Sequence, residues 1–144
     1  MSSPAATEKL LCLTMLGYMK AGLTEDELYH FQIEKHAQLV SGLMEKYGVT
    51  RYTITHNTKA TRALLPQLFD PSYVEFGDHD FIVRIIFPSI DVFLALKEDP
   101  VYRERIQMDH LNFADRKMKT KMNLGFVNEI IDGGKVLPVV EKSA

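Results

Sequence analysis

The stretch that decides the fold is DFIVRIIF, residues 80–87, a run rich in β-branched and aromatic residues that ends at Pro88. Such a run, bounded by turn-forming residues, is typical of a buried β-strand. A strand with one face in water alternates apolar and polar side chains, but here only Arg84 interrupts the apolar pattern. Both faces of the sheet that contains this strand are therefore predicted to be covered.

The elements around this strand predict an α+β chain. Thr24 and Glu27 form a capping box that opens a helix, Gly48 ends it, and Pro100 separates two later helices. The order β-α-β, a connection, then β-α-α-β is that of a ferredoxin-like fold, a four-stranded antiparallel sheet with helices on one face. The predicted strands are residues 10–19, 51–57, 80–87 and 121–130, and the predicted helices are residues 25–47, 61–69, 89–99 and 101–117.

The chain is predicted to form one domain, residues 9–131, between a flexible N-terminal tail (1–8) and a C-terminal tail (132–144). Residues 58–78 are long for a plain strand connection, and we expect an insertion that covers a pocket as a lid. Since helices occupy one face of the sheet, a second copy of the sheet is the simplest cover for the other. The sequence thus predicts a homodimer, a dimeric α+β barrel with a cavity in each half.

Composition is that of a soluble globular protein, with 46% hydrophobic and 25% charged residues among 144. The net charge of −2 and the pI near 6.2 favour neither nucleic acid nor an anionic membrane surface as a partner. No apolar run reaches the roughly 18 residues of a membrane span. The lone Cys12 forms no internal disulfide and the first residues lack the regions of a signal peptide, so a cytoplasmic location is expected.

Three histidines are candidates for acid–base chemistry. His36 in IEKHAQLV and His110 in MDHLNFADRK fall on the apolar stripes of predicted helices, and His56 shares a strand face with Tyr52. A neutral imidazole donates or accepts a proton near physiological pH, although each histidine could instead be a core residue bonded to a backbone carbonyl. The spacings of metal-binding histidines and of phosphate-binding loops are absent, so neither a metal nor a cofactor is expected.

Four stretches carry a resemblance to a known family: YHFQIEKHAQLVSGLMEKYGV, RYTITHN, LFDPSY and above all MDHLNFADRK. Over about residues 10–127 the chain resembles the EthD-domain family of dimeric α+β barrels. It is most similar to the fungal branch that tailors aromatic polyketides in anthraquinone and xanthone pathways, and there to decarboxylases of atrochrysone carboxylic acid or related products. The resemblance implies a cofactor-free homodimeric enzyme with an apolar pocket for an aromatic polyketide in each half.

Roles for individual residues follow from the resemblance. Loss of CO2 from a β-keto or ortho-hydroxyaryl acid leaves an electron pair that a carbonyl or a protonated ring must accept. An imidazolium stabilises the enolate and then delivers a proton to carbon. His110 is the expected acid, with His36 as its partner or as the carbonyl binder. The expected substrate contacts are Tyr18, Tyr52, His56, Phe113 and an inward-pointing Arg84, and Asp109 and Asp115 are expected to tune the imidazoles.

Other activities fit the same fold and pocket: dehydration, aldol cyclisation, lactone isomerisation and cofactor-free oxygenation of anthrones. A different class is a carrier that binds a polyketide without turning it over. A carrier would bind saturably, form no product and tolerate His110→Asn, whereas an acid–base enzyme would not.

Overall fold

The computed structural model describes residues 9–139, and every structural statement below concerns that part of the chain. Four strands form one sheet: β1 (Leu10–Gly17), β2 (Arg51–His56), β3 (Phe81–Phe87) and β4 (Lys121–Val127). All neighbours are antiparallel and the spatial order is β2-β3-β1-β4, so β2 and β4 are the edge strands. The predicted four-stranded antiparallel sheet is confirmed.

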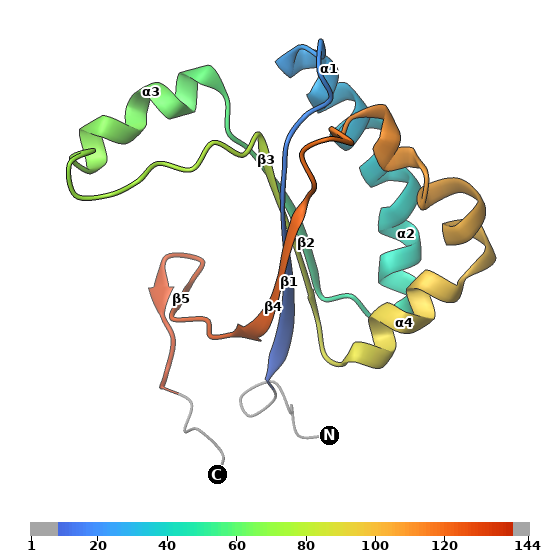
Figure 1. The fold of residues 1–144 in the computed structure, drawn as a ribbon. Helices are drawn as coiled ribbons and strands as arrows, with labels where there is room; N and C mark the ends of the chain where they lie inside the picture. Colours follow the sequence, from blue (N-terminus) through green and yellow to red (C-terminus); the bar gives the residue numbers. More distant parts are fainter. Residues whose placement is uncertain (1–8, 140–144) are drawn as a thin grey trace.

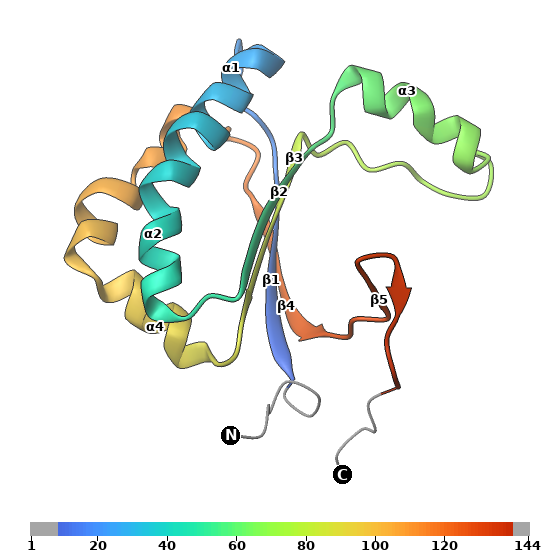
Figure 2. The same cartoon turned by 180° about the vertical axis from the view of Figure 1, so that it is seen from behind.

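Most of the helices form a layer on one side of this sheet (Figure 1; Figure 2). This layer consists of α1 (Glu25–Tyr29), the π-helix η2 (His30–His36), α2 (Ala37–Tyr47), α4 (Ile90–Glu98), the π-helix η3 (Tyr102–Ile106) and the 3-10 helix η4 (Asp109–Asn112). The opposite side carries only α3 (Lys59–Leu68) and a hairpin of β5 (Ile131–Asp132) and β6 (Lys135–Val136). The ferredoxin-like arrangement predicted from the element order is therefore confirmed.

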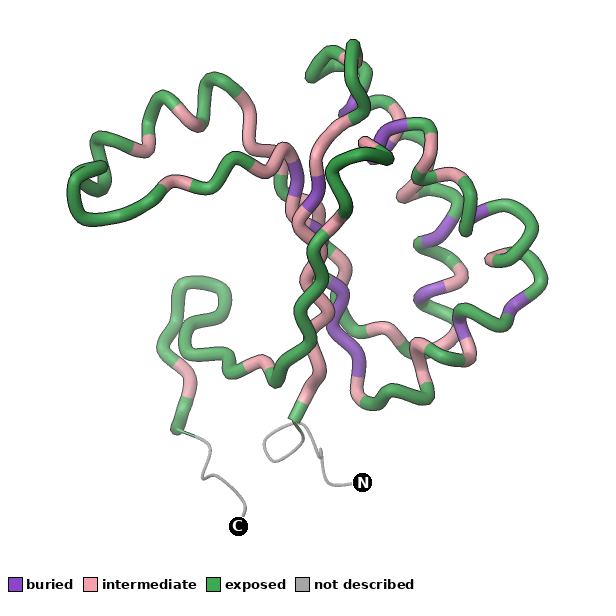
Figure 3. The backbone as a smooth tube through the Cα atoms, viewed as in Figure 1, coloured by how far each residue is buried: buried purple, intermediate pink, exposed green. Residues whose placement is uncertain are grey.

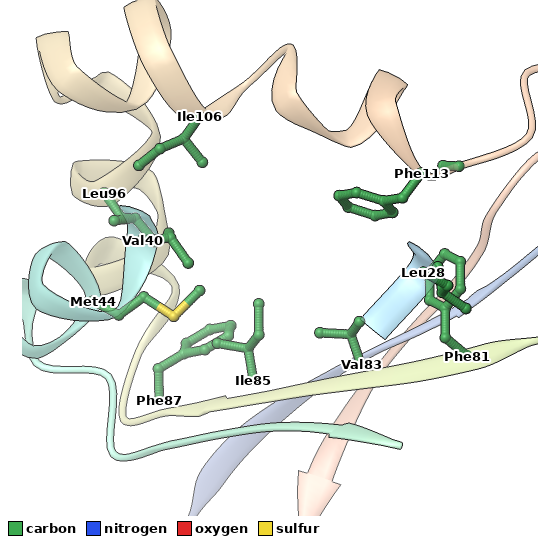
Figure 4. Packing of buried hydrophobic residues seen from close by; sticks show 11 residues of the cluster. Leu28, Val40, Met44, Phe81, Val83, Ile85, Phe87, Leu96, Ile106 and Phe113 are labelled. Carbon is green, nitrogen blue, oxygen red and sulfur yellow. The ribbon is translucent and has the colours of Figure 1, made fainter. Parts of the chain in front are cut away.

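Strand β3 forms the centre of the core because it is paired on both sides. Its alternate residues Phe81, Val83, Ile85 and Phe87 point toward the helices and are at most 8% exposed. Side chains from the helix layer approach them from the other side, among them Ile106 and Phe113 (Figure 4). Buried positions therefore gather on β3 and on the inner sides of the helices (Figure 3).

The long helix after β1 begins and ends where the sequence predicts. The Thr24 hydroxyl accepts a hydrogen bond from the Glu27 amide, and the Glu27 carboxylate accepts one from the Thr24 amide. Gly48, at φ 98°, ends the helix in the left-handed region that glycine adopts without strain. The middle of the helix is not α-helical, however, because η2 makes i to i+5 hydrogen bonds such as that from the Ala37 amide to the Gln32 carbonyl.

The last predicted helix, residues 101–117, is much shorter in the structure. It is π-helical over η3, turns at residues 107–108 and finishes as the 3-10 helix η4. The backbone then bonds to the segment after β1, through the amide of Lys20 to the carbonyl of Phe113 and the amide of Asp115 to the carbonyl of Tyr18. These long-range hydrogen bonds replace the helical ones, so the predicted helix is wrong beyond Asn112.

Residues 58–78, called the arm below, consist of α3 and a return segment that leads back to β3. The Thr58 hydroxyl caps α3 by accepting a hydrogen bond from the Thr61 amide. The insertion was expected to cover a pocket, and the structure places the arm on the side of the sheet opposite to the main helix layer (Figure 1; Figure 2). It therefore does not cover the histidines of its own chain.

The two predicted tails are described in part. Residues 1–8 and 140–144 lie outside the described residues. Within the predicted tail 132–144, the β5–β6 hairpin turns at Gly133 and Gly134, whose φ angles of 58° and 80° lie in the left-handed region. No helix in residues 9–139 is long and apolar enough to cross a membrane.

Candidate active site

The first part of the candidate site is a pair of side chains, His36 and Asp109. Nδ1 of His36 lies 2.8 Å from Oδ2 of Asp109, and the two side chains are only 18% and 16% exposed. Because a carboxylate only accepts hydrogen bonds, Nδ1 donates and Nε2 is the nitrogen left free for a substrate. The ring of Phe113 meets the imidazole edge-on, with 5.3 Å between centroids. Asp109 and Phe113 together hold the orientation of the His36 ring.

A second imidazole, His56, is held by a hydrogen bond across the space between β2 and η2. Its Nε2 lies 2.6 Å from Oε1 of Gln32, a side chain that is only 1% exposed. Since the amide oxygen accepts, Nε2 of His56 donates and Nδ1 keeps its lone pair. Burial lowers the pKa of His56, so this imidazole is neutral at physiological pH. Gln32 and His36 both belong to η2, which thereby connects the two histidines.

Two tyrosines and a phenylalanine pair also lie between the helices and the sheet. Tyr52 faces the helices from β2, as His56 does, but Ile54 stands between them and the two positions are about 13 Å apart along the strand. Burial, with a contribution from Tyr102, raises the pKa of Tyr52 to about 12. Tyr52 therefore remains a neutral phenol that can donate a hydrogen bond. The rings of Phe81 and Phe113 pack edge to face with centroids 5.9 Å apart. The Phe81–Phe113 pair thus gives His36 an aromatic, apolar neighbour, while the two tyrosines lie near each other farther along the sheet.

The helix layer covers the sheet unevenly and leaves an apolar row open on β4. By register, Met122, Leu124 and Phe126 lie opposite Met15, Leu13 and Leu11, on the side that faces the helices. They are nevertheless 61%, 52% and 61% exposed. A flat apolar molecule would therefore find uncovered surface on the same side of the sheet as His56 and Tyr52.

Of the two histidines expected to be catalytic, His110 lies at the surface and not at the predicted inward position. Its side chain is exposed, and its Nδ1 donates to the carbonyl oxygen of Gln107 at 2.7 Å. The helix that was expected to carry it inward ends before it, and in the 3-10 turn of η4 the preceding residue, Asp109, points to His36 instead. The inward position predicted for His110 is thus occupied by the carboxylate beside it.

Three further candidates lie away from the imidazoles. Arg84 pairs with Thr14 and Thr53 on the face opposite to the helices, so it does not point inward as a carboxylate holder must. Tyr18 donates to Oδ1 of Asp78 at the root of the arm. Asp115 accepts hydrogen bonds from the amides of residues 117 and 118 and so stabilises a turn. The candidates that the structure does bring together are His36, Asp109 and Phe113, and Gln32 of η2 connects His56 to them. Tyr52 lies farther along β2.

Two residues, Gln32 and Tyr102, and the apolar row on β4 were not among the candidates predicted from the sequence. Gln32 and Tyr102 share predicted helical stripes with His36 and Ile106, which was a usable signal. The β4 row alternates with Asn123 and Gly125, the period of a strand. Among residues 9–139, no three His, Cys, Asp or Glu side chains are arranged to hold a metal ion.

The fold and the site define a class: a ferredoxin-like α+β domain with an imidazole–carboxylate pair and a second imidazole between its helices and its sheet. The EthD domain is matched over residues 20–117, and the chain belongs to the EthD domain family. The family predicted from the four quoted stretches is therefore confirmed.

Several similar proteins of known name come from fungi. "Dehydratase aurZ" of Gibberella zeae is 48% identical over 131 residues, which are 91% of this chain and 86% of that protein. "Conidial pigment biosynthesis dehydratase EthD" of Metarhizium robertsii is 42% identical, with 91% and 92% covered. "Decarboxylase nsrE" of Aspergillus novofumigatus is 39% identical, with 90% and 85% covered. The chain is thus similar to fungal proteins that are named dehydratases or decarboxylases.

Solved structures support the fold alone. A dimeric ferredoxin-like protein of unknown function from Thermobifida fusca has a TM-score of 0.54 at 14% identity, with 84% of this chain and 93% of that chain covered. The hydroxynitrile lyase of Passiflora edulis has a TM-score of 0.54 at 12% identity, with 87% and 99% covered. At such low identities, the shared fold carries no statement about the reaction.

Proposed function

We propose that this protein is a lyase that forms an enolate of an aromatic polyketide in the space between its helices and its sheet, without a cofactor. Loss of water from a β-hydroxyketone is the first candidate reaction. The observation that carries it is the presence of two differently held imidazoles, one hydrogen-bonded to a carboxylate and one neutral. Dehydration needs both a base at carbon and an acid at the leaving oxygen.

The neutral His56 is suited to be the base. It removes a proton from the carbon next to the ketone, and the C–H electrons move onto the carbonyl oxygen to form the enolate. The enolate then reforms the ketone and a carbon–carbon double bond, while the C–O bond breaks. His36, protonated on both ring nitrogens, gives its Nε2 proton to the departing hydroxide, which leaves as water. Its Nδ1–H stays hydrogen-bonded to Asp109, which keeps the ring in place.

Loss of CO2, the reaction expected from the sequence, is the second candidate. The same enolate forms when a β-keto acid loses CO2, and relatives at 39–40% identity are named decarboxylases. Dehydration ranks first because relatives at 48% and 42% identity are named dehydratases. In addition, Arg84, the cation expected to hold a carboxylate, lies on the opposite face of the sheet.

One substrate tests both reactions. Atrochrysone carboxylic acid, the compound class implied by the resemblance, carries a β-hydroxyketone and a carboxyl group. Purified protein without added cofactor would be incubated with it, and the products followed by mass spectrometry beside a no-protein control. Loss of water above the control supports the first candidate, and loss of CO2 supports the second. Saturable binding without either product would contradict the enzyme and favour the carrier.

A further inference from the structure

We propose that the arm, residues 58–78, binds a second copy of this chain by packing α3 and its return segment on the partner's sheet, on the face that the helices leave free. Four sets of observations support this proposal: the apolar side chains of the arm, the rigidity of its root, the charges of the two surfaces and the area that the sheet alone would bury. The proposal concerns assembly and holds for either candidate reaction.

The arm presents large apolar side chains that the described part of the chain leaves more than half exposed. Helix α3 has no buried residue, although it contains Leu64 and Leu68, which are 54% and 70% exposed. The return segment adds Phe69 and Tyr73, which are 61% and 87% exposed. Contiguous exposed apolar groups of this size mark an interaction surface in soluble proteins.

The root of the arm is held firmly to the body of the domain. Nη2 of Arg62 donates to the carbonyl oxygens of Asp78 and His79 and to Oδ1 of Asp80, at 3.0–3.2 Å. Asn57 donates to the carbonyl of His79 as well, at 2.8 Å. These hydrogen bonds hold the two ends of the arm together and so fix the direction in which the arm projects. A surface that is ordered before binding loses less conformational entropy when it binds.

The return segment and the free face of the sheet carry opposite charges. Residues 69–78 contain three acidic residues, Asp70, Glu75 and Asp78, and no basic one. The free face, read from the strand register, carries Arg51, Arg84 and Lys121 and no acidic residue in the four strands. In the same chain the arm projects away from this face, so the complementary charges meet only when a second copy supplies one of the surfaces.

The free face alone is small for a stable dimer. Four strands about 4.8 Å apart and about seven residues long give a flat area near 440 Å². Two such faces would bury about 900 Å² in total, below the roughly 1,000 Å² expected of a specific interface. The arm and the β5–β6 hairpin rise on either side of this face, so a partner seated between them gains additional contact (Figure 2). Because the contact is isologous, each copy would give one arm and receive one.

The test is the oligomeric state of the full chain, measured by sedimentation velocity over a range of concentrations. Leu64→Lys combined with Leu68→Lys should raise the dimer dissociation constant about ten-fold or more, since two apolar contacts would become buried charges. Leu94→Lys, on the outer side of α4, is the matched control because Leu94 is 50% exposed, close to Leu64, and should leave the constant unchanged.

Charge reversal tests the surface on which the arm packs. Arg84→Glu and Glu75→Lys should each weaken the dimer, and the combination should restore part of the loss, because each surface then faces its opposite charge again. Circular dichroism would confirm that all variants remain folded. A wild-type chain that is monomeric at all concentrations, arm variants as dimeric as the control, or charge reversals whose effects simply add would each overturn the proposal.

Discussion

His36 and Asp109 are 73 residues apart in the chain, and their side chains share a hydrogen bond of 2.8 Å. Each is held by a helix of unusual geometry, His36 at the end of the π-helix η2 and Asp109 at the start of the 3-10 helix η4. Such irregular turns often occur at functional sites because they re-aim a side chain relative to a regular helix. The pair therefore depends on local backbone geometry at both of its ends.

The His36–Asp109 pair predicts a graded loss of activity. His36→Asn should lower kcat by roughly 10²–10⁴-fold, the usual contribution of a general acid or base. Asp109→Asn should cost less, roughly 10–100-fold, because the imidazole remains but loses its orienting carboxylate. His110→Ala is the matched control, since the exposed His110 bonds only to a backbone carbonyl, and it should keep wild-type kcat. A large loss in the His110 variant with none in the His36 variant would reverse the assignment.

Burial of His56 predicts a pH-dependent stability. Its pKa is lowered in the folded protein, whereas the unfolded chain titrates near the ordinary value of about 6.5. As the pH falls through about 6.5, the unfolded chain binds a proton that the folded protein does not, so the free energy of unfolding decreases. Urea denaturation between about pH 7.5 and 5.5 would measure this slope. His56→Gln should make the slope shallower, and an unchanged slope would show that His56 does not cause it.

Gly17 predicts a steric effect at the edge of the site. A Cβ atom at this position would overlap the ring of Phe81, which itself packs against Phe113. Gly17→Ala should therefore lower the free energy of unfolding by about 1–3 kcal/mol, as overpacking of a core does. Gly125→Ala is the control, because nothing lies within 4 Å of a Cβ atom there. Equal stability of the two variants in chemical denaturation would contradict this account.

Two leucines on α4 predict opposite outcomes for the same substitution. Leu96 is fully buried, so Leu96→Ala should leave a cavity and lower the free energy of unfolding by about 2–5 kcal/mol. Leu94 is 50% exposed, so Leu94→Ala should change it by only about 0.5 kcal/mol or less. Chemical denaturation of both variants gives the comparison. Similar losses in the two would mean that the outer side of α4 is also covered.

The sheet and the first helix could be predicted from the sequence because their signals are local. The apolar run of residues 80–87 and the capping box at Thr24 each define an element without reference to the rest of the chain. His36 was placed correctly for the same reason, since its helix keeps one inward stripe through η2. The family could likewise be predicted from the motifs around His36 and Asp109.

The sequence could not predict that Asp109, and not His110, would point toward His36. Helical periodicity assumes that the helix continues, but hydrogen bonds from residues 113–115 to the segment after β1 end it early. Because η4 is a 3-10 helix and not a continued α-helix, the inward-facing position shifts by one residue, from His110 to Asp109. The direction of the arm could not be predicted either. It depends on three hydrogen bonds from Arg62 to residues 78–80, and no local sequence pattern relates these two segments.

The uneven cover of the sheet has a consequence for how the proposed binding site could diversify. Met122, Leu124 and Phe126 line the open side of β4 but lie outside the buried core, so substitutions among them cost little stability. The core on β3 and the hydrogen bond between His36 and Asp109 would persist through such changes. A lineage could therefore widen or narrow the range of molecules it accepts by drift along one edge strand, without first evolving a more stable fold.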